Sequence, residues 1–419
     1  MASSGSLCRR RETCRLCDSR DLDLVFSLTP TPPANAFVPP TALRTSQQCF
    51  PLDLFFCKSC AHLQLRDVID PVHLFENYVY VSGTSQVFIN HFRDYAEAVI
   101  QSLDLKSSDL IVDIGSNDGT FLRYFSRAGM RILGVDPARL IVDQANAGGL
   151  ESWPEFFTQE VADRIRMERG EARLISANNV FAHADDLRGM VKAVKSLLAP
   201  DGVFVFEVSY LADVYQKTLF DTIYHEHLAY HSVKPLITFL RSEGLELFAA
   251  RRVPSHGGSL RGLAQPASGP RRADGSVAEL VKLEESLGLD KAETFRVYAA
   301  KINKVKVTLS GILAGLKRQG KKIAGFGAPA KATTLMYHFG LGPDLITYIM
   351  DDSVLKQGLH TPGLHIPVVK PDIINSKDKR PDFLLILAWN FADSIIEKNA
   401  GFREAGGRFI IPLPEVRVI

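Results

Sequence analysis

The sequence predicts an α/β protein, and two similar stretches far apart in the chain support this prediction. In each, an apolar run of strand character leads into a glycine turn and then into a helix start, first at residues 110–122 and again at 322–331. Strand, tight turn and helix in this order form the first unit of a doubly wound domain, whose ligand lies at the carboxyl ends of the strands. Two closely spaced pairs of cysteines near the beginning of the chain predict a small metal-stabilised module before these halves.

Composition places the chain among ordinary globular proteins. Its 419 residues are 46% hydrophobic and 23% charged, enough for two or three domains of roughly 150 residues. The net charge of +2 gives no bulk attraction for nucleic acid or an anionic membrane. No apolar run reaches membrane-spanning length, and the basic first residues lack the apolar stretch of a secretory signal. We expect a short disordered tail there and a cytoplasmic protein that acts on a small molecule.

The cysteines predict a structural zinc site. Two C-x-x-C pairs offer four thiolates at tetrahedral spacing, which closes the coordination sphere. The predicted ligands are Cys14, Cys17, Cys57 and Cys60. Redox-active thiols and free core cysteines are the alternatives. Of the remaining two, we expect Cys8 to lie in the tail and Cys49 to be a small buried hydrophobe.

Next to this module lies a short aromatic segment. Tyr78 and Tyr80 alternate, so they point to one side of an extended chain, before a polar turn at residues 82–85. They either contact a ligand or belong to a surface loop. Residues 86–103 carry apolar side chains at helical spacing and predict a helix that leads into the first strand.

The first glycine turn carries acids where a dinucleotide loop would hold a pyrophosphate. Asp113 ends the strand and Asp118 lies within the turn, which lacks the G-x-G-x-x-G pattern. Two carboxylates would repel a phosphate. A phosphate-free ligand with a positive centre fits better, and S-adenosylmethionine (SAM) has a sulfonium, an ammonium and two ribose hydroxyls. An α/β domain that binds another nucleotide, or no ligand, is the alternative.

The next two strand ends support SAM. The strand at 131–136 ends in Asp136, about 20 residues after the turn, where an acid can take ribose hydroxyls. A third strand end at 174–181 offers two asparagine amides to the amino-acid end of the cofactor. The residues expected at the cofactor are Asp113, Gly115, Ser116, Asn117, Asp118, Gly119, Asp136, Asn178 and Asn179. Two late strands joined by a glycine-containing loop near residues 255–259 predict an antiparallel edge hairpin.

Residues 221–231 have the most unusual composition in the chain, with three histidines, two acids and two tyrosines. A histidine beside a carboxylate can act as a general base near neutral pH. His227 and His231 have the i, i+4 spacing of metal ligands, but H-E-x-x-H is absent and no third ligand is evident. A plain structural cluster is the third interpretation.

The last third of the chain predicts a second α/β unit. Residues 266–285 are rich in Pro, Gly and Ser and then charged, as in a linker, and an amphipathic helix follows at about 291–318. The glycine turn at 325–331 carries Lys331 and no acid, which favours an anion. A structural domain that binds nothing is the alternative. The domain ranges we predict are 12–68 for the zinc module, 69–265 for the cofactor domain with the histidine segment, and 266–419 for the linker helix and the second unit.

Taken in order, these motifs resemble the nucleotide-sugar C-methyltransferases that act on TDP-linked 4-keto-deoxysugars. The shared motifs are the two Cys-x-x-Cys pairs, Tyr78-x-Tyr80, Asp113-x-Gly-Ser-Asn-Asp-Gly119, Asn178-Asn-Val-Phe-Ala-His183, Tyr224-His-Glu-His227, His256-Gly-Gly-Ser-Leu-Arg261, Gly325-x-Gly-Ala-Pro-Ala-Lys331 and Asp351-Asp352. The resemblance implies a zinc-binding N-terminal domain, a central SAM-methyltransferase Rossmann-like domain and a C-terminal Rossmann-like domain that binds the nucleotide sugar.

The resemblance also implies roles for single residues. His227 is expected to be the general base, within a catalytic group that also holds Tyr78, Tyr224, His225 and Glu226. The residues expected at the substrate are Tyr80, His183, His256, Lys331 and Asp351. The 4-keto group acidifies the hydrogen on carbon 3, a histidine removes it, and tyrosine hydroxyls donate to the enolate oxygen.

Three other functions remain open at this point: a SAM-dependent methyltransferase with another acceptor, a keto-sugar isomerase, and a non-catalytic nucleotide-sugar-binding protein.

Overall fold

The computed structural model describes residues 7–75, 83, 86–376 and 378–419. The chain folds into two compact units, and it passes between them more than once. The first unit comprises Met1–Asp23, Phe55–Asp213 and Leu228–Ala292, and the second comprises Leu24–Leu54, Val214–His227 and Glu293–Ile419. The histidine-rich segment up to His227 therefore folds with the C-terminal part of the chain.

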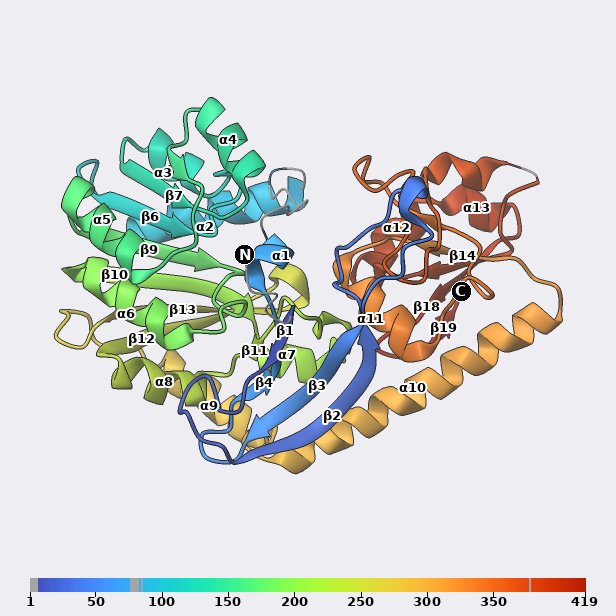
Figure 1. Cartoon of the computed structure of the whole chain (residues 1–419), viewed down its shortest axis with the longest axis horizontal. Helices are drawn as coiled ribbons and strands as arrows, with labels where there is room; N and C mark the ends of the chain where they lie inside the picture. Colours follow the sequence, from blue (N-terminus) through green and yellow to red (C-terminus); the bar gives the residue numbers. More distant parts are fainter. Residues whose placement is uncertain (1–6, 76–82, 84–85, 377) are drawn as a thin grey trace, which may run out of the picture. The chain divides into compact units, whose positions relative to one another are not determined.

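A seven-stranded sheet forms the centre of the first unit, in the order β12-β13-β10-β9-β6-β7-β8 (Figure 1). Its strands are β6 (Leu110–Ile114), β7 (Arg131–Val135), β8 (Ser152–Trp153), β9 (Ala172–Asn178), β10 (Leu198–Ser209), β12 (Leu245–Val253) and β13 (Ser259–Pro266). The pairs from β10 to β8 are parallel, and β13 is antiparallel to both of its neighbours. The late antiparallel hairpin expected from the sequence is confirmed.

Helices cover both faces of this sheet (Figure 1). They are α2 (Gln86–Leu103), α3 (Leu122–Arg127), α4 (Arg139–Ala147), α5 (Gln159–Arg169), α6 (Leu187–Leu197), α8 (Val233–Ser242) and α9 (Ser276–Ser286), with α1 (Pro71–Phe75) before them and α7 (Leu211–Gln216) after β10. The expected helix over residues 86–103 is confirmed. Its apolar face, including Phe92, Tyr95 and Val99, packs in one buried cluster with Ile111 of β6 and Phe121. Burial of this face, rather than helix propensity alone, stabilises α2.

The N-terminal segment forms a strand from Cys8 on, and the first six residues of the expected tail lie outside the described residues. β1 (Cys8–Arg10) pairs antiparallel with β5 (Asp67–Ile69), so the expectation that Cys8 lies in a disordered tail is wrong. Two arginines attach this segment to the rest of the first unit, because Arg9 and Arg11 both form ion pairs with Asp185. A further sheet has the order β11-β4-β3-β2, with β2 (Leu22–Thr31), β3 (Phe50–Cys57), β4 (Leu63–Leu65) and β11 (Ala229–Tyr230).

The segment expected to be a linker is partly helical. α9 occupies residues that the sequence assigned to a linker, and its Glu284 is buried. That carboxylate accepts the backbone amides of Val233 and Lys234, at 2.6 and 3.0 Å, and the hydroxyl of Tyr210 at 2.8 Å. The linker prediction is wrong for this segment. Residue type alone would place Glu284 at the surface, but hydrogen-bond partners distant in sequence bury it.

The second unit is built on a six-stranded sheet in the order β16-β15-β14-β17-β18-β19, parallel except for β19. The strands are β14 (Ile323–Phe326), β15 (Ile349–Met350), β16 (Val368–Val369), β17 (Phe383–Ile386), β18 (Arg408–Ile411) and β19 (Arg417–Val418). The helices are α10 (Ala292–Arg318), α11 (Ala330–Phe339), α12 (Ala392–Lys398) and α13 (Ala400–Glu404). The long helix and the second α/β unit are confirmed, and with them the predicted fold class.

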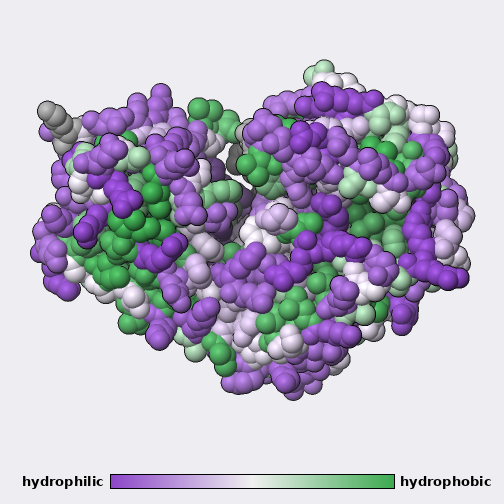
Figure 2. Space-filling model, turned by 180° about the vertical axis from the view of Figure 1, so that it is seen from behind, coloured by the Kyte–Doolittle hydropathy of each residue, from purple (hydrophilic) through white to green (hydrophobic). Residues whose placement is uncertain are grey.

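Large apolar side chains are exposed at several places among the described residues. Hydrophilic residues dominate the face seen in Figure 2, and hydrophobic residues lie there in patches. Exposed apolar residues such as Leu140, Met167 and Val307 come from separate helices. Among the described residues, no helix is both long enough and apolar enough to cross a membrane.

Candidate active site and zinc centre

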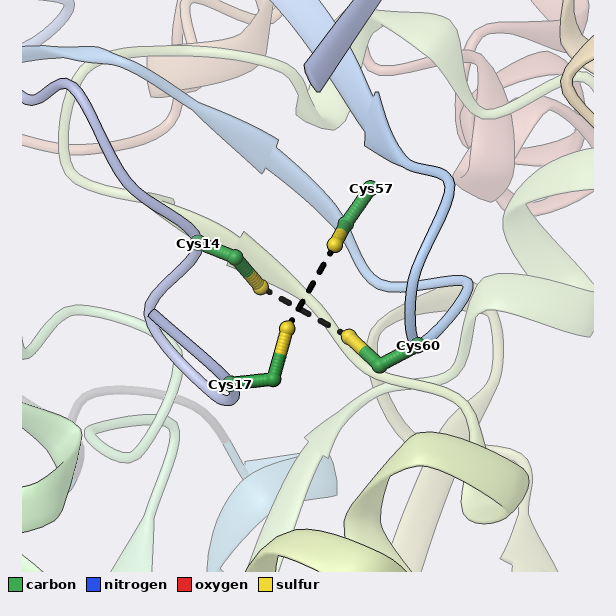
Figure 3. A group of neighbouring side chains, drawn as sticks. All are labelled: Cys14, Cys17, Cys57 and Cys60. Atoms are coloured by element: carbon green, nitrogen blue, oxygen red, sulfur yellow. Dashed lines mark hydrogen bonds between the residues drawn. The ribbon is translucent and has the colours of Figure 1, made fainter. Parts of the chain in front are cut away.

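The four paired cysteines converge on one point (Figure 3). Their sulfur atoms lie within 4.8 Å of one another, with 3.6 Å between Cys14 and Cys60 and 3.5 Å between Cys17 and Cys57. Tetrahedral zinc with bonds of about 2.3 Å separates its sulfur ligands by roughly 3.8 Å, so this cluster fits Zn²⁺ closely. All four ligand positions are protein thiolates, and the zinc is therefore structural.

The other two cysteines lie outside this cluster. Cys49 is exposed, which contradicts the expectation that it is a buried hydrophobe. Its sulfur lies 4.0 Å from the hydroxyl of Tyr337. The residue directly precedes β3. Residue type alone does not tell whether a cysteine at the start of a strand is exposed or buried in the core.

The first glycine turn leaves no room for a side chain. Gly115, directly after β6, has a φ of +68° and its amide donates to the carbonyl of Val135 at 2.7 Å. A Cβ atom at this position would lie 2.2 Å from a methyl group of Val180. Gly119 is similar, with a φ of +72°, and a Cβ atom there would lie 2.7 Å from a methyl group of Leu150. Both glycines are therefore required by the backbone path of the turn.

Asp136 holds this turn from the end of β7. One carboxylate oxygen accepts the amide of Asn117 and the other accepts the amide of Ala138, both at 2.9 Å. Burial raises the pKa of this carboxyl, while the two amides oppose the rise. Each oxygen keeps a second lone pair, so the carboxylate can still accept ribose hydroxyls.

Asp113, near the end of β6, is buried in the protein and is not exposed at the edge of the sheet where a ligand would bind. Its carboxylate accepts the hydroxyl of Ser176 at 2.6 Å, and only 3% of the residue is exposed. Burial raises the pKa of Asp113 to about 7. Asp113 is thus only partly charged at neutral pH, and its effect on a ligand is smaller than its sequence position suggests.

The remaining turn residues, Ser116, Asn117 and Asp118, differ in their contacts. Asp118 accepts the amide of Gly83 at 3.0 Å and the hydroxyl of Thr120 at 2.7 Å. Ser116 has a buried hydroxyl without a partner among the described residues. Asn117 takes a left-handed conformation with a φ of +51°.

Asn178 carries the clearest ligand-binding group of the first unit. It is the last residue of β9, and both polar atoms of its side-chain amide are buried with no partner in the part of the chain that the structure describes. Buried amides are normally hydrogen-bonded. Asn179 differs, since its backbone amide is bonded to the carbonyl of Glu207 at 2.7 Å. The strands β7, β6 and β9 are neighbours, so Asp136, the glycine turn and Asn178 meet at one edge and fit SAM.

A buried charged network that the sequence did not predict lies at the end of β10. Glu207 is bonded to His91 at 2.8 Å, to Ser255, and to Arg261 at 2.8 Å. Burial opposes the charge of Glu207, but the hydrogen bond from His91 and the Arg261 cation hold its pKa at about 2. This network explains the arginine of the His256–Arg261 motif as a partner of Glu207.

Two residues expected at the substrate lie in the first unit. His183 stacks on Phe75, with the ring centroids 5.6 Å apart and an angle of 7° between the rings. His256 is exposed and takes a left-handed conformation with a φ of +50°, and its ring centroid is 4.3 Å from that of Phe88. Tyr78 and Tyr80 lie outside the described residues.

In the second unit, His227 is held between two partners. Its Nδ1 lies 2.8 Å from the carbonyl oxygen of Thr222, and its Nε2 lies 3.0 Å from the hydroxyl of Tyr224. A carbonyl only accepts, so Nδ1 carries the hydrogen and Nε2 presents its lone pair to the tyrosine hydroxyl. Burial lowers the pKa of His227 to about 4, against the opposing effect of the Thr222 carbonyl. The imidazole is therefore neutral at pH 7 and able to accept a proton.

The two residues between Tyr224 and His227 point to other parts of the second unit. His225 is buried, and its Nε2 lies 3.3 Å from the carbonyl of Phe50. Glu226 is also buried and accepts the side-chain amide of Asn35 at 2.8 Å. No sequence signal marked Asn35, because it lies 191 residues from Glu226.

Lys331 belongs to a buried polar cluster. Its ammonium donates to the side chain of Asn390 at 2.5 Å and lies 4.9 Å from the ring centroid of Trp389. Trp389 in turn donates its indole N–H to Asp221 at 2.6 Å. Burial lowers the pKa of Lys331, and the nearby Asp221 opposes that change. Sequence reasoning missed Asp221 and Trp389 as partners.

The second glycine turn repeats the arrangement of the first. Gly327 has a φ of +84° and donates to the carbonyl of Met350 at 2.7 Å. Asp351, directly after β15, accepts the amides of Ala328 at 2.5 Å and Ser353 at 2.8 Å. Asp351 thus occupies the place that Asp136 has in the first unit. The turn amides of Gly327 and Ala328 are already bonded, so an anion here would depend on nearby ammonium groups. These are Lys331 and also Lys356, which donates to the carbonyl of Ala328 at 2.7 Å.

Comparison with known proteins covers nearly the whole chain. Three family models match: "Putative zinc binding domain" at residues 14–75, "Methyltransferase domain" at 88–250 and "C-methyltransferase C-terminal domain" at 254–414. The C-methyltransferase NovU of Streptomyces niveus is 38% identical over 408 residues, which is 97% of both chains. The ubiquinone biosynthesis O-methyltransferase of Ralstonia nicotianae is 24% identical over 159 residues, or 35% of this chain and 67% of that protein.

Solved structures resemble part of the chain. The SAM-bound magnesium protoporphyrin IX methyltransferase of Synechocystis covers 45% of this chain and 84% of its own, with 13% identity and a TM-score of 0.32. The three consecutive family models and the end-to-end similarity to NovU agree with the zinc cluster and with the methyltransferase-type sheet of the first unit. The chain belongs to the family of SAM-dependent C-methyltransferases that carry an N-terminal zinc-binding domain.

Proposed function

We propose that this C-methyltransferase acts on a nucleotide-linked 4-keto-deoxysugar and methylates the carbon next to the ketone. One observation carries the proposal: a neutral histidine, His227, whose Nε2 lone pair faces the hydroxyl of Tyr224 at 3.0 Å. Methylation of a carbon requires a carbanion or enolate, so the enzyme needs a base for a C–H bond and a donor for the oxygen that becomes negative. The pair supplies both groups from one short segment.

The chemistry of the pair follows from its hydrogen bonds. Nε2 of His227 takes the proton from the carbon next to the ketone, and the imidazolium formed is stabilised by its Nδ1–H bond to the Thr222 carbonyl. Tyr224, released from Nε2, donates its hydroxyl hydrogen bond to the enolate oxygen. When bound, SAM supplies an electrophilic methyl group to that carbon. His225 and Glu226 hold the segment through Phe50 and Asn35.

Other residues are assigned to binding. In the first unit, Asp136 would accept the ribose hydroxyls of SAM and the free amide of Asn178 would bind its amino-acid end. In the second unit, Lys331 supplies a buried positive charge for a diphosphate, and Asp351 a hydroxyl acceptor. Tyr78, Tyr80, His183 and His256 are assigned to the sugar on the motifs they share with the family.

Along the sequence, the proposed ranges are 12–68 for zinc, 69–265 for SAM and 266–419 for the nucleotide sugar. The compact units cross these ranges, since residues 24–54 and 214–227 fold with the C-terminal part and residues 266–292 with the first unit. A thiolate zinc centre suits a reducing compartment, which supports a cytoplasmic location.

The test is mass spectrometry of the acceptor after incubation in deuterated water. The purified protein is given a TDP-4-keto-6-deoxysugar, with SAM in one sample and without it in the other. We expect the mass increase of one added methyl group, about 14 mass units, only when SAM is present. The NMR spectrum of the product should place the new methyl group on carbon 3.

The other outcomes separate the alternatives. Deuterium at carbon 3 in both samples, without methylation, would indicate an isomerase or a different methyl acceptor. No change in the sugar, with SAM bound tightly, would exclude this substrate class and leave the C-methyltransferase with an unidentified acceptor.

A further inference from the structure

Arg15, next to the zinc ligand Cys14, is one of the most deeply buried charged residues of the protein. Only 1% of it is exposed. Its guanidinium forms an ion pair with Asp185 at 2.9 Å and donates to the side chain of Gln64 at 3.3 Å and to the carbonyl of Leu65. A buried cation is costly unless it is paired, so these partners fix the position of the side chain.

The partners of Arg15 belong to two different segments. Gln64 and Leu65 lie in β4, which follows the zinc ligand Cys60. Asp185 lies in the loop that follows β9, two residues after His183. Gln64 strengthens the first link, because its side chain also accepts the backbone amide of Arg15 at 2.9 Å. Arg15 therefore connects the zinc centre to the loop that ends the predicted cofactor strand.

Both segments hold the same short piece of chain. The amide of Leu65 donates to the carbonyl of Leu228 at 2.9 Å, and Gln64 pairs with Ala229 in the β4–β11 ladder. From the other segment, the carbonyl of Ala182 accepts the amides of Leu228 at 2.9 Å and Ala229 at 3.1 Å. Leu228 is the residue directly after His227 in the chain. The two residues that follow the proposed base are thus fixed on both sides.

We propose that Arg15 is a positioning residue for methyl transfer. Arg15 joins β4 to the loop of Asp185. These two segments carry the Leu65 amide and the Ala182 carbonyl, which bind Leu228 and Ala229. Arg15 thereby restrains the chain directly after His227. Zinc bound at Cys14 would hold the backbone next to Arg15. Small errors in the position of a catalytic group lower turnover strongly.

Two substitutions and a control test this role. Arg15→Met keeps much of the apolar volume and removes the charge and all donors. Arg15→Lys keeps the charge but loses the fork that binds several acceptors at once. Arg20→Met is the matched control, because Arg20 is exposed in the same module. For each protein we would measure zinc content, SAM affinity, hydrogen exchange of the peptide spanning residues 228–231, and kcat and KM for the keto-sugar below the melting temperature.

We expect Arg15→Met to retain one zinc per chain and to bind SAM within about twofold of wild type. Its kcat should fall about 10- to 100-fold with little change in KM, and the amides of Leu228 and Ala229 should exchange faster. Arg15→Lys should recover part of the loss, and Arg20→Met should match wild type in every measurement.

A zinc-loaded Arg15→Met protein with wild-type kcat and unchanged exchange at residues 228–231 would overturn the proposal. So would a variant that only melts earlier, because a purely structural role would lower stability without changing kcat of the folded molecules. The turnover measurement rests on the proposed substrate. If wild type does not methylate the keto-sugar, the proposed function fails, and the exchange of residues 228–231 alone decides the role of Arg15.

Discussion

The hydroxyl of Tyr224 lies 3.0 Å from Nε2 of His227, and the other ring nitrogen of His227 lies 2.8 Å from the Thr222 carbonyl. These two contacts fix both the orientation and the tautomer of the imidazole. The nitrogen that keeps its lone pair is the one that faces a hydroxyl donor. The proposed base and the proposed oxygen-stabilising group, three residues apart in sequence, would then act on neighbouring atoms of one ketone.

Replacing His227 by asparagine should lower turnover by two or more powers of ten, because the amide cannot take a proton from carbon. SAM affinity should persist, since the predicted cofactor residues lie in the first unit. Steady-state kinetics and calorimetric SAM titration provide the two measurements. Tyr224→Phe serves as the matched variant and should lose about 10- to 100-fold, because it removes only the hydroxyl donor. Unchanged turnover in His227→Asn would remove this residue from the role of base.

The pH dependence of turnover should reflect the lowered pKa of His227, about 4. The active form is the neutral imidazole, so activity at saturating SAM should be level from pH 8 to pH 6 and fall only as the pH approaches 4. An acid limb centred near 6.5, the pKa of an exposed histidine, would contradict the buried environment. The pH–activity profile of Tyr224→Phe, which changes the surroundings of His227, distinguishes the titration of His227 from that of other groups.

Asp113→Asn should stabilise the protein at pH 8. The carboxyl has a folded-state pKa of about 7, raised by burial, so its contribution to stability is greatest below pH 4 and is lost as the pH rises through 7. An asparagine can still accept the Ser176 hydroxyl and carries no charge to bury. We expect a gain of about 1–3 kcal/mol in urea unfolding at pH 8 and no gain at pH 4. A loss of stability at pH 8 would show that the carboxylate is better solvated than its burial indicates.

Removing one zinc ligand should release the metal. Cys17→Ser should reduce the zinc content well below one ion per chain and lower the melting temperature, because a closed thiolate site contributes directly to folding. Cys8→Ser and Cys49→Ser are controls, since neither residue belongs to the cluster. Elemental analysis and thermal unfolding provide the readouts. Loss of zinc in a control variant would mean that the ligand set differs from Cys14, Cys17, Cys57 and Cys60.

Lys331→Met should raise KM for the nucleotide sugar by about tenfold or more while SAM affinity stays constant. The substitution removes the buried ammonium beside Trp389 and Asn390, and a charged donor to phosphate contributes more than a neutral one. Lys301→Met, an exposed position on α10, is the control. A normal KM in Lys331→Met would place the diphosphate elsewhere.

Local patterns were sufficient for much of the fold and for the zinc cluster. The glycine turns, the acid after β7 and the paired cysteines are short signals whose spacing is tied to one geometry. The structure brings the four thiolates together and sets Asp136 against the first glycine turn, while its role at the cofactor stays a prediction. The hairpin at the end of the first sheet followed from alternation and a glycine-rich loop.

Contacts between distant parts of the chain were the features that the sequence could not reveal. Glu226 meets Asn35 and Asp221 meets Trp389 across 191 and 168 residues. No local pattern marks such pairs. The same holds for α9, whose buried acid has partners before β13, and for the N-terminal arginines, which bind Asp185. Asp113 is an acid, which residue type alone would place at the surface, but its side chain is buried. Successive side chains of a strand point to opposite faces of the sheet, so the sequence does not reveal how deeply the last ones are buried.

The most direct test of the account is exchange of the carbon 3 hydrogen in deuterated water, measured by NMR with the TDP-4-keto-6-deoxysugar and S-adenosylhomocysteine, which cannot donate a methyl group. If His227 is the base, wild type incorporates deuterium at carbon 3, Tyr224→Phe does so more slowly, and His227→Asn does not. Exchange in His227→Asn at the wild-type rate would contradict the assignment of His227 as the base that begins carbon methylation.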